Sequence, residues 1–204
     1  NAGKEPIYIE KFLSCSMDMM DRDLDLISFT GRHAMERTME RTLVTHIKTE
    51  FGSIRGTSSH HYNPAMILCD RHATEDAGDC FGLCLAYSGS FTAMAQKDQR
   101  DQIRVQMGIN PYQFRWCLTE GETFFAPQVI LSFSNQGFSK LSHQYHDILH
   151  EHMCRGRYKH ERRPVLINNW EATYFDFNEE KIEKIAAQAG ELGIEMMVLD
   201  DGWF

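Results

Sequence analysis

The sequence predicts a mainly β protein, in which an antiparallel β-sandwich is followed by a connecting helix and the start of a parallel β/α layer. Three observations carry this prediction. Short period-two segments separated by turn residues run from Ile7 to about Phe133, which is typical of an antiparallel sandwich. An amphipathic pattern with helical period follows. The remaining chain holds two apolar segments flanking a second helical pattern, which indicates a β-α-β unit.

The composition fits a globular protein and argues against several functional classes. The chain has 204 residues, of which 42% are hydrophobic and 25% charged, enough for a sizeable core. Its net charge of −8 argues against nucleic acid or an anionic membrane surface as a partner, because phosphate binding needs clustered Lys and Arg. No apolar segment approaches the ~20 residues that span a bilayer. The start shows no signal-peptide core, which is informative if Asn1 is the natural start.

The cysteines predict a reduced, cytoplasmic protein. They lie far apart and form no C-x-x-C pair, and a chain of this length does not need disulfides to fold. We therefore expect mostly buried free thiols. Cys80 and Cys84 lie in one strand-like segment, and packing is the favoured reading for both. The six cysteines are Cys15, Cys69, Cys80, Cys84, Cys117 and Cys154.

Alternating segments predict the strands of the sandwich. Asp25–Gly31, Arg104–Ile109 and Tyr112–Leu118 alternate apolar with polar residues, as half-buried strands do. The segment "FGLCLAY-SGS-FTAMAQ" predicts a hairpin with a three-residue loop at Ser88–Ser90. Trp116 alternates with other apolar residues, so we expect it in the sandwich core.

One amphipathic helix is predicted over Phe138–Cys154, followed by a basic, polar connector at Arg155–Pro164 that resembles a domain junction. His143, His146 and His150 share one face of this helix. Three such residues could bind zinc, but polar residues on a helix usually form its solvated face. We favour the solvated or interdomain reading and predict no metal site.

The β-α-β unit consists of two apolar segments around a helix. Val165–Trp170 is strand-like, and Asp176 or Asn178 can cap a helix with an acidic first turn. Gly193 would end that helix, and the following segment is nearly all apolar, as expected of a parallel strand covered on both faces. The residues expected to be buried on the helix are Ile182, Ile185, Ala186, Ala189 and Leu192.

Polar and aromatic residues follow both strands of this unit. The first turn lacks glycine and carries four carboxylates, which argues against a dinucleotide site. In a (β/α)₈ barrel, residues at the carboxyl ends of the strands face the site. Carboxylates, amides and indoles are groups that bind sugars. The residues expected at that edge are Asn168, Asn169 and Trp170 from one strand and Asp200, Asp201 and Trp203 from the other.

Adjacent Asp200 and Asp201 are expected to recognise a sugar rather than to cleave one. Neighbours on a strand point to opposite faces, and only the break at Gly202 could turn both toward one ligand. Retaining glycosidases need two carboxyl groups ~5–5.5 Å apart that flank the scissile bond. Two hydroxyls of one sugar are a better match for this pair.

The segments "RPVLINNWEATYFDFNEEKI" and "ELGIEMMVLDDGWF" resemble the start of the catalytic barrel of bacterial α-galactosidases of glycoside hydrolase family 36. Upstream segments such as "RGTSSHHYNPAMIL" resemble the N-terminal β-supersandwich of that family, so the likeness runs from about Ser14 to Phe204. The implied domains are a β-supersandwich incomplete at its start (1–136), a helix and linker (137–163), and the first β-α-β unit of a truncated TIM barrel (164–204). The chain is thus expected to be part of a longer protein.

The resemblance implies a hydrolase that releases terminal α-linked galactose from raffinose-type oligosaccharides with retention of configuration. It implies that Asp200 and Asp201 bind galactose hydroxyls and that Trp170 lines the galactose subsite. For Trp203, sugar contact and packing at the barrel rim have equal support. The nucleophile and the acid/base would lie on later strands, so this chain is expected to contain no catalytic residue and to be inactive alone. The resemblance further implies no cofactor, a homotetramer, and a bacterial cytoplasmic location.

Two alternatives remain open from the sequence. The chain could be a stand-alone β-sandwich module for sugar binding or oligomerisation, although two parallel strands make no closed core. The parent could also be an α-N-acetylgalactosaminidase or a galactosyl-transferring relative. The loop Ser58–Pro64 is expected to be a hydrogen-bonded loop before a strand, with contact to a neighbouring subunit's site as the alternative.

Overall fold

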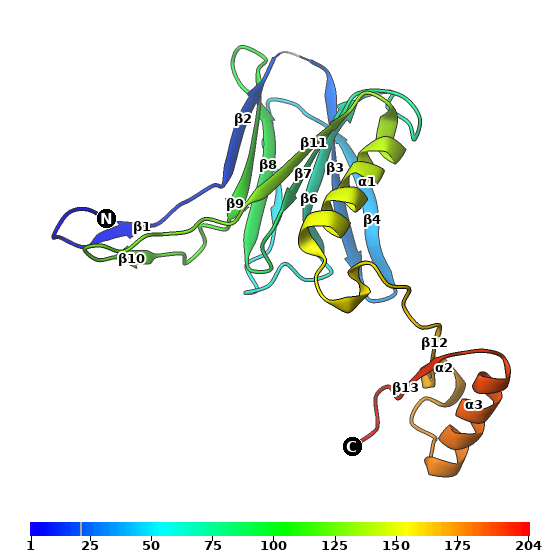
Figure 1. The fold of residues 1–204 in the computed structure, drawn as a ribbon. Helices are drawn as coiled ribbons and strands as arrows, with labels where there is room; N and C mark the ends of the chain where they lie inside the picture. Colours follow the sequence, from blue (N-terminus) through cyan, green and yellow to red (C-terminus); the bar gives the residue numbers. More distant parts are fainter. Residues whose placement is uncertain (21) are drawn as a thin grey trace. The chain divides into compact units, whose positions relative to one another are not determined.

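The computed structural model describes residues 1–20 and 22–204, which form two compact units, Asn1–Ile148 and Leu149–Phe204. The first unit is built mainly from two antiparallel sheets (Figure 1). A five-stranded sheet has the order β11 (Val129–Ser134), β7 (Cys80–Leu85), β6 (Tyr62–Asp70), β3 (Leu24–Arg32) and β4 (Met35–Leu43). A four-stranded sheet has the order β2 (Cys15–Met19), β9 (Ile103–Ile109), β8 (Phe91–Lys97) and β5 (Thr49–Gly52). A separate antiparallel ladder joins β1 (Ile7–Ile9) to β10 (Trp116–Leu118).

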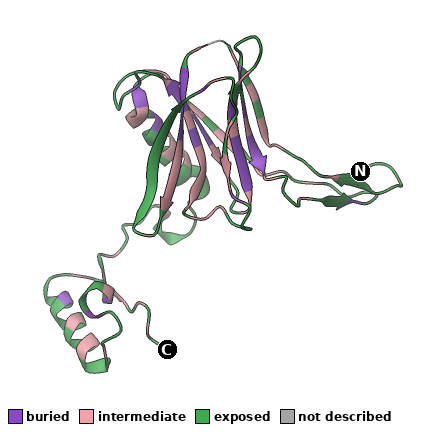
Figure 2. Cartoon of the chain, turned by 180° about the vertical axis from the view of Figure 1, so that it is seen from behind, coloured by how far each residue is buried: buried purple, intermediate pink, exposed green. Residues whose placement is uncertain are grey.

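The main core lies between these two sheets. Alternate residues of β3, β6 and β7 meet alternate residues of β8 and β9, and Figure 2 shows buried residues concentrated on these strands. Leu68, Phe91 and Val105 are fully buried there. Gly52 permits the close approach of β5 to β8, because a Cβ at this position would lie 2.1 Å from the carbonyl oxygen of Phe91. The mainly β class predicted from alternation is confirmed.

Helix α1 (Gly137–Ile148) packs on the other face of the five-stranded sheet (Figure 1). Its buried Leu141 joins a second cluster with residues of β3, β6 and β7. The Tyr145 hydroxyl donates to the carbonyl oxygen of Ile130 at 3.1 Å, and Gly82 leaves room for the Tyr145 ring. The helix predicted over Phe138–Cys154 is confirmed in place, but its α-helical part ends at Ile148 and a π-helical turn, Leu149–Met153, follows it.

Three sequence predictions for the first unit are wrong. Strands β7 and β8 form no hairpin, since they belong to different sheets, and β8 instead pairs with β9. Only Trp116–Leu118 of the predicted strand Tyr112–Leu118 is a strand. The Trp116 side chain is outside the core, with 49% of the residue exposed, because its strand pairs with β1 and not with the sandwich sheets. Alternation identifies a strand but leaves its partner undetermined.

The second unit confirms the predicted β-α-β pattern. A 3₁₀ turn (Arg157–Lys159) precedes β12 (Leu166–Asn168), the short helix α2 (Trp170–Thr173), helix α3 (Glu179–Glu191) and β13 (Met196–Val198). Strands β12 and β13 are parallel, with Asn168 opposite Val198. Asn178 caps α3 by accepting from the Lys181 backbone N–H at 3.0 Å.

Helix α3 ends as the sequence predicts, but its buried face is narrower. Gly193 has φ +79°, the left-handed conformation typical of a helix end. Ala189 is buried, and Ile182 and Ile185 are half-buried. Leu192, expected on the buried face, is 81% exposed because it caps the helix, and Ala186 is also exposed. In the part of the chain that the structure describes, no helix has the length and apolarity to span a membrane.

Candidate functional site

The candidate site lies at the carboxyl ends of β12 and β13. Because the two strands are parallel, the residues that follow them meet at one edge of the sheet. The Asn169 backbone N–H continues the pairing by donating to the Val198 carbonyl oxygen at 3.3 Å. The sequence therefore places Asn168 and Asn169 beside Asp200 at this edge.

Asn168 links the two strand ends through its side-chain amide. Its Nδ2 donates to Asp200 Oδ2 at 2.6 Å, and its Oδ1 accepts from the Trp170 backbone N–H at 2.7 Å. One amide thus fixes the direction of a carboxylate and the start of the next helix. Hydrogen bonds to a charged acceptor are roughly twice as strong as neutral ones.

Asn169 has no exposed surface and supports the site through its side-chain amide. Its Oδ1 accepts from the Asp200 backbone N–H at 2.8 Å, and its Nδ2 donates to Thr173 Oγ1 at 3.0 Å. Sequence reasoning placed Asn169 among residues facing a ligand, whereas its amide is used to hold the second strand end. Thr173, which it did not identify, is buried as well; its spacing of four residues from Asn169 was the available signal.

The two aspartates have different environments. Asp200 is half-buried, and both its oxygens have partners, since Oδ1 accepts from the Asp201 backbone N–H at 2.8 Å. Asp201 is exposed, and its Oδ1 accepts from the Gly202 backbone N–H at 2.9 Å. Within residues 1–20 and 22–204, Asp201 Oδ2 accepts no hydrogen bond. Gly202 has φ +90° and makes this turn possible.

The tryptophans are placed differently from the aspartates. Trp170 begins helix α2 instead of ending the strand, is half-buried, and packs edge-on against Phe175 with ring centroids 4.9 Å apart. Trp203 is 71% exposed and packs against Phe204 at 5.7 Å. Among the described residues, neither indole makes a hydrogen bond with Asp200 or Asp201. The structure thus brings Asn168, Asn169 and Asp200 together, while the roles of Asp201, Trp170 and Trp203 stay predictions.

The histidines of the connecting helix have local partners. The rings of His143 and His146 lie 6.2 Å apart. His150 is hydrogen-bonded to the Lys159 carbonyl oxygen at 2.6 Å and to Glu151 at 2.8 Å, and these acceptors raise its pKa. In the described part of the chain, no group of three or more His, Cys, Asp or Glu side chains is arranged to hold a metal ion.

Comparison with known proteins gives two family matches along the chain. Residues 1–119 match the family model described as the glycosyl hydrolase family 36 N-terminal domain, and residues 123–204 match the melibiase family model. The first match begins at residue 1, earlier than Ser14, where the motifs alone placed the start of the likeness.

Several known proteins are similar over the whole chain. A bifunctional α-galactosidase/sucrose kinase of Mediterraneibacter gnavus is 50% identical, with the chain covering 22% of it. The α-galactosidase Mel36A of Lactobacillus acidophilus is 47% identical, with 28% of it covered. A crystal structure of the family 36 α-galactosidase AgaA of Geobacillus stearothermophilus in complex with stachyose aligns over all of this chain and 28% of its own, with a TM-score of 0.95 and 45% identity.

The chain spans about a quarter of the length of these relatives. The alignments extend over both units, because each of them covers the entire chain. The family 36 model alone matches more than half of the chain. The chain therefore belongs to glycoside hydrolase family 36.

Proposed function

We propose that this chain is part of a retaining α-galactosidase and supplies one side of its galactose subsite. The carrying observation is the hydrogen-bonded edge at which Asn168 and Asn169 hold the side chain and the backbone of Asp200. Family membership supports the reaction class. The relatives with similar sequence are named α-galactosidases, and structures of the Geobacillus enzyme hold stachyose or raffinose. We extend that substrate class, raffinose-type oligosaccharides, to the whole protein.

In this proposal the two aspartates accept hydrogen bonds from sugar hydroxyls. Asp200 is fixed in advance by Asn168 and the Asp201 N–H, so little conformational freedom is lost when a hydroxyl binds. Asp201 offers Oδ2 as a charged acceptor at the exposed edge. Trp170 would cover the apolar C–H face of the pyranose, and Trp203 is a further sugar-contacting candidate. Charge-assisted bonds to hydroxyls supply orientation as well as affinity.

Bond cleavage is assigned to residues outside this chain. Retention requires a nucleophile and an acid/base about 5–5.5 Å apart on opposite sides of the scissile bond. Asp200 and Asp201 are adjacent, and each is tied to a neighbouring backbone N–H, which suits recognition of one sugar. We therefore expect the 204-residue chain to release no galactose from raffinose, whereas the full-length protein does.

The subsite can be tested in the full-length protein with Asp201→Asn, which keeps the shape and removes the charge. We expect kcat/KM for an α-galactoside to fall by about 10- to 150-fold, since a hydrogen bond to a charged group contributes ~1.5–3 kcal/mol. Trp170→Ala should lower kcat/KM as well. The matched control is Asp176→Asn, because Asp176 lies in the same unit and, among the described residues, its carboxylate bonds to Lys181 alone. Equal activity of Asp201→Asn and Asp176→Asn would refute the assignment.

The same proposal covers organisation and location. We propose the domain limits 1–136, 137–163 and 164–204 for the parent, a homotetrameric assembly, and a cytoplasmic location. Free thiols at all six cysteines support the location. Limited proteolysis of the full-length protein tests the limits, and light scattering coupled to size exclusion tests the assembly. A monomer of unchanged activity would contradict the tetramer.

A further inference from the structure

Two free cysteines lie directly opposite each other in the five-stranded sheet. Cys69 on β6 pairs with Cys80 on β7 in the antiparallel register, and both are free thiols with no exposed surface. Both belong to the cluster beneath helix α1, together with Ile27 and Leu141. Cross-strand partners project to the same face, so the two thiols lie side by side on the face that α1 covers, where the Cys80 thiol donates to the Gly78 carbonyl oxygen at 3.8 Å.

The hydrogen-bond pattern identifies the type of this cross-strand pair. At the next position along the ladder, the Asp70 N–H donates to the Asp79 carbonyl oxygen at 2.9 Å. Hydrogen-bonded and non-hydrogen-bonded pairs alternate in an antiparallel ladder, so Cys69 and Cys80 form a non-hydrogen-bonded pair. The Cα atoms of such pairs are ~4.5 Å apart, within the ~4.4–6.8 Å that a disulfide spans. The backbone therefore needs little adjustment to accept an S–S bond here.

The other cysteines lack this arrangement. In the described strands, the residues opposite them are not cysteines. Cys15 faces Met107, Cys84 faces Ala65 and Ile130, and Cys117 faces Tyr8. Cys154 lies outside any strand. Cys69 and Cys80 are thus the one cysteine pair that the described ladders align.

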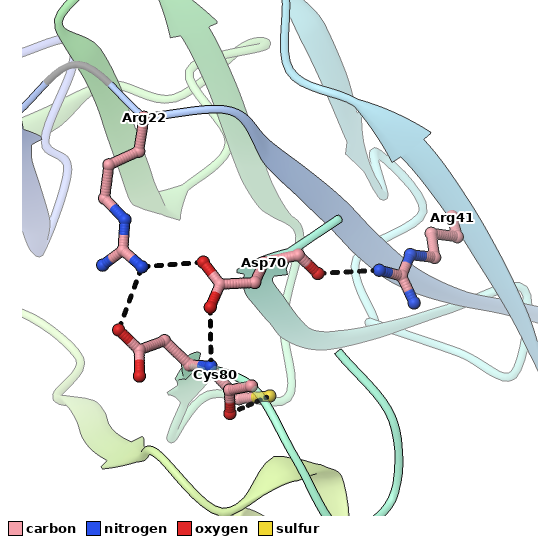
Figure 3. A network of polar contacts seen from close by, with 6 residues as sticks. Arg22, Arg41, Asp70 and Cys80 are labelled. Atoms are coloured by element: carbon pink, nitrogen blue, oxygen red, sulfur yellow. Dashed lines mark hydrogen bonds and ion pairs between the residues drawn. The ribbon is translucent and has the colours of Figure 1, made fainter. Parts of the chain in front are cut away.

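Ion pairs and hydrogen bonds hold the end of the β6–β7 hairpin next to these cysteines (Figure 3). Arg22 bonds to Asp70 Oδ1 at 2.7 Å and to Asp79 Oδ2 at 2.9 Å. On the other side, Arg41 bonds to Asp25 at 2.7 Å and donates to the Asp70 carbonyl oxygen at 2.8 Å. Arg22 and Arg41 thereby both bond to the end of the β6–β7 hairpin. Opening it requires these bonds to break.

Burial also keeps the two sulfurs in their unreactive form. It raises the pKa of Cys69 to about 12 and that of Cys80 to about 11. The Arg41 guanidinium favours the thiolates, but desolvation outweighs it. Since the thiolate is the nucleophile, the closed hairpin reacts slowly, and reaction requires an open state.

We propose that Cys69 and Cys80 are a modification site, at which hydrogen peroxide forms a cross-strand disulfide when the β6–β7 hairpin opens. One thiolate attacks a peroxide oxygen, so that an S–O bond forms, the O–O bond breaks, and hydroxide leaves to take up the thiol proton as water. The second thiol sulfur then attacks the sulfenic sulfur, so that the S–S bond forms, the S–O bond breaks, and the leaving hydroxide takes up the second thiol's proton as water. Two thiols are oxidised by two electrons, and one peroxide is reduced to two waters.

The disulfide would close the hairpin covalently. The closed loop from Cys69 to Cys80 would constrain the unfolded chain, and such a constraint stabilises a protein when the native geometry is unstrained. We expect the midpoint of thermal unfolding of the first unit to rise by roughly 5–10 °C. The inference is independent of the proposed galactosidase function, because its readout is thiol chemistry.

The test treats the intact chain with hydrogen peroxide, blocks the remaining thiols after unfolding, and maps linked peptides by mass spectrometry. We expect a Cys69–Cys80 linkage, lost in Cys69→Ser and in Cys80→Ser and retained in the matched control Cys84→Ser. Arg22→Gln should accelerate its formation about 1.4- to 5-fold, since partly exposed ion pairs contribute ~0.2–1 kcal/mol.

Two outcomes would overturn the proposal. In the first, Cys69 and Cys80 of the unsubstituted chain remain alkylatable after exposed Cys117 and Cys154 are fully oxidised. In the second, the dominant linkage joins either residue to another cysteine. Both are read on the unsubstituted chain, so failure of a serine variant to fold does not affect the result.

Discussion

Replacement of Asn169 by alanine tests how the strand ends are joined. Asn169 has no exposed surface, and its amide makes two side-chain hydrogen bonds, from the Asp200 N–H at 2.8 Å and to Thr173 at 3.0 Å. Each such bond contributes ~0.5–1.5 kcal/mol net. Asn169→Ala should therefore make local opening of this edge easier by about 1–3 kcal/mol, which is roughly 5- to 150-fold in the opening equilibrium.

The assay is hydrogen–deuterium exchange of the full-length protein, read on the peptide that contains residues 196–204. Exchange of the Asp200 backbone N–H, which donates to Asn169, should accelerate by roughly 5- to 150-fold. Asn168→Ala is the matched control, because the Asn168 side chain bonds to the Asp200 carboxylate and not to the Asp200 backbone N–H, and this bond is solvent-exposed. Unchanged exchange in Asn169→Ala, or a larger effect in Asn168→Ala, would refute the support role of Asn169.

Three further predictions concern backbone strain, core packing and pH. Gly202→Ala should destabilise the second unit by about 1–3 kcal/mol in chemical unfolding, because φ is +90° and the new Cβ would lie 2.9 Å from Phe175. Leu68→Ala should lower the free energy of unfolding of the first unit by about 2–5 kcal/mol, since Leu68 is fully buried. The Arg162 guanidinium lowers the pKa of Glu195 to about 2, below its value in the unfolded chain. The stability that Glu195 contributes is therefore complete above pH ~4.3 and lost as pH falls toward 2, and Arg162→Gln should raise this pKa in an NMR titration of the side chain.

Matched variants separate these effects from general damage. Gly190→Ala lies in a helix with open space around the added methyl and should be neutral or stabilising. Met39→Ala removes a side chain that is 56% exposed and should change stability far less than Leu68→Ala. Comparable losses in Gly202→Ala and Gly190→Ala would contradict the strain argument, and comparable losses in Leu68→Ala and Met39→Ala would contradict the packing argument.

Sequence patterns predicted local structure better than strand partners. The period-two segments located β3 and β9, and Asn178 and Gly193 located both ends of α3. The expected hairpin around Ser88–Ser90 was wrong, because a short glycine-containing loop can also carry the chain from one sheet of a sandwich to the other. Short-range signals fix a turn, and which strands pair depends on contacts distant in sequence.

The sequence predicted the location of the candidate site, but only some of the hydrogen bonds within it. The carboxyl ends of two parallel strands could be inferred from chain order, which put Asn168 and Asp200 at one edge. The burial of Asn169 could not be inferred from the sequence, since a side-chain amide after a strand can bond equally well to a ligand or to a neighbouring backbone N–H. Trp170 was expected on the strand, but the Asn168 side chain accepts its N–H and begins a helix there.

Asp200 and Asp201 differ in their hydrogen bonds and in their exposure to solvent. This difference explains why two neighbouring negative charges are tolerated at this edge. Asp200 is held by a side-chain amide and a backbone N–H, so its charge is spread over two donors. Asp201 is exposed, where water screens its repulsion with Asp200. A neutral ligand rich in hydroxyl donors can satisfy both carboxylates at once, whereas an anionic ligand would add a third negative charge. The charge pattern alone therefore favours a neutral sugar over a phosphorylated one at this edge.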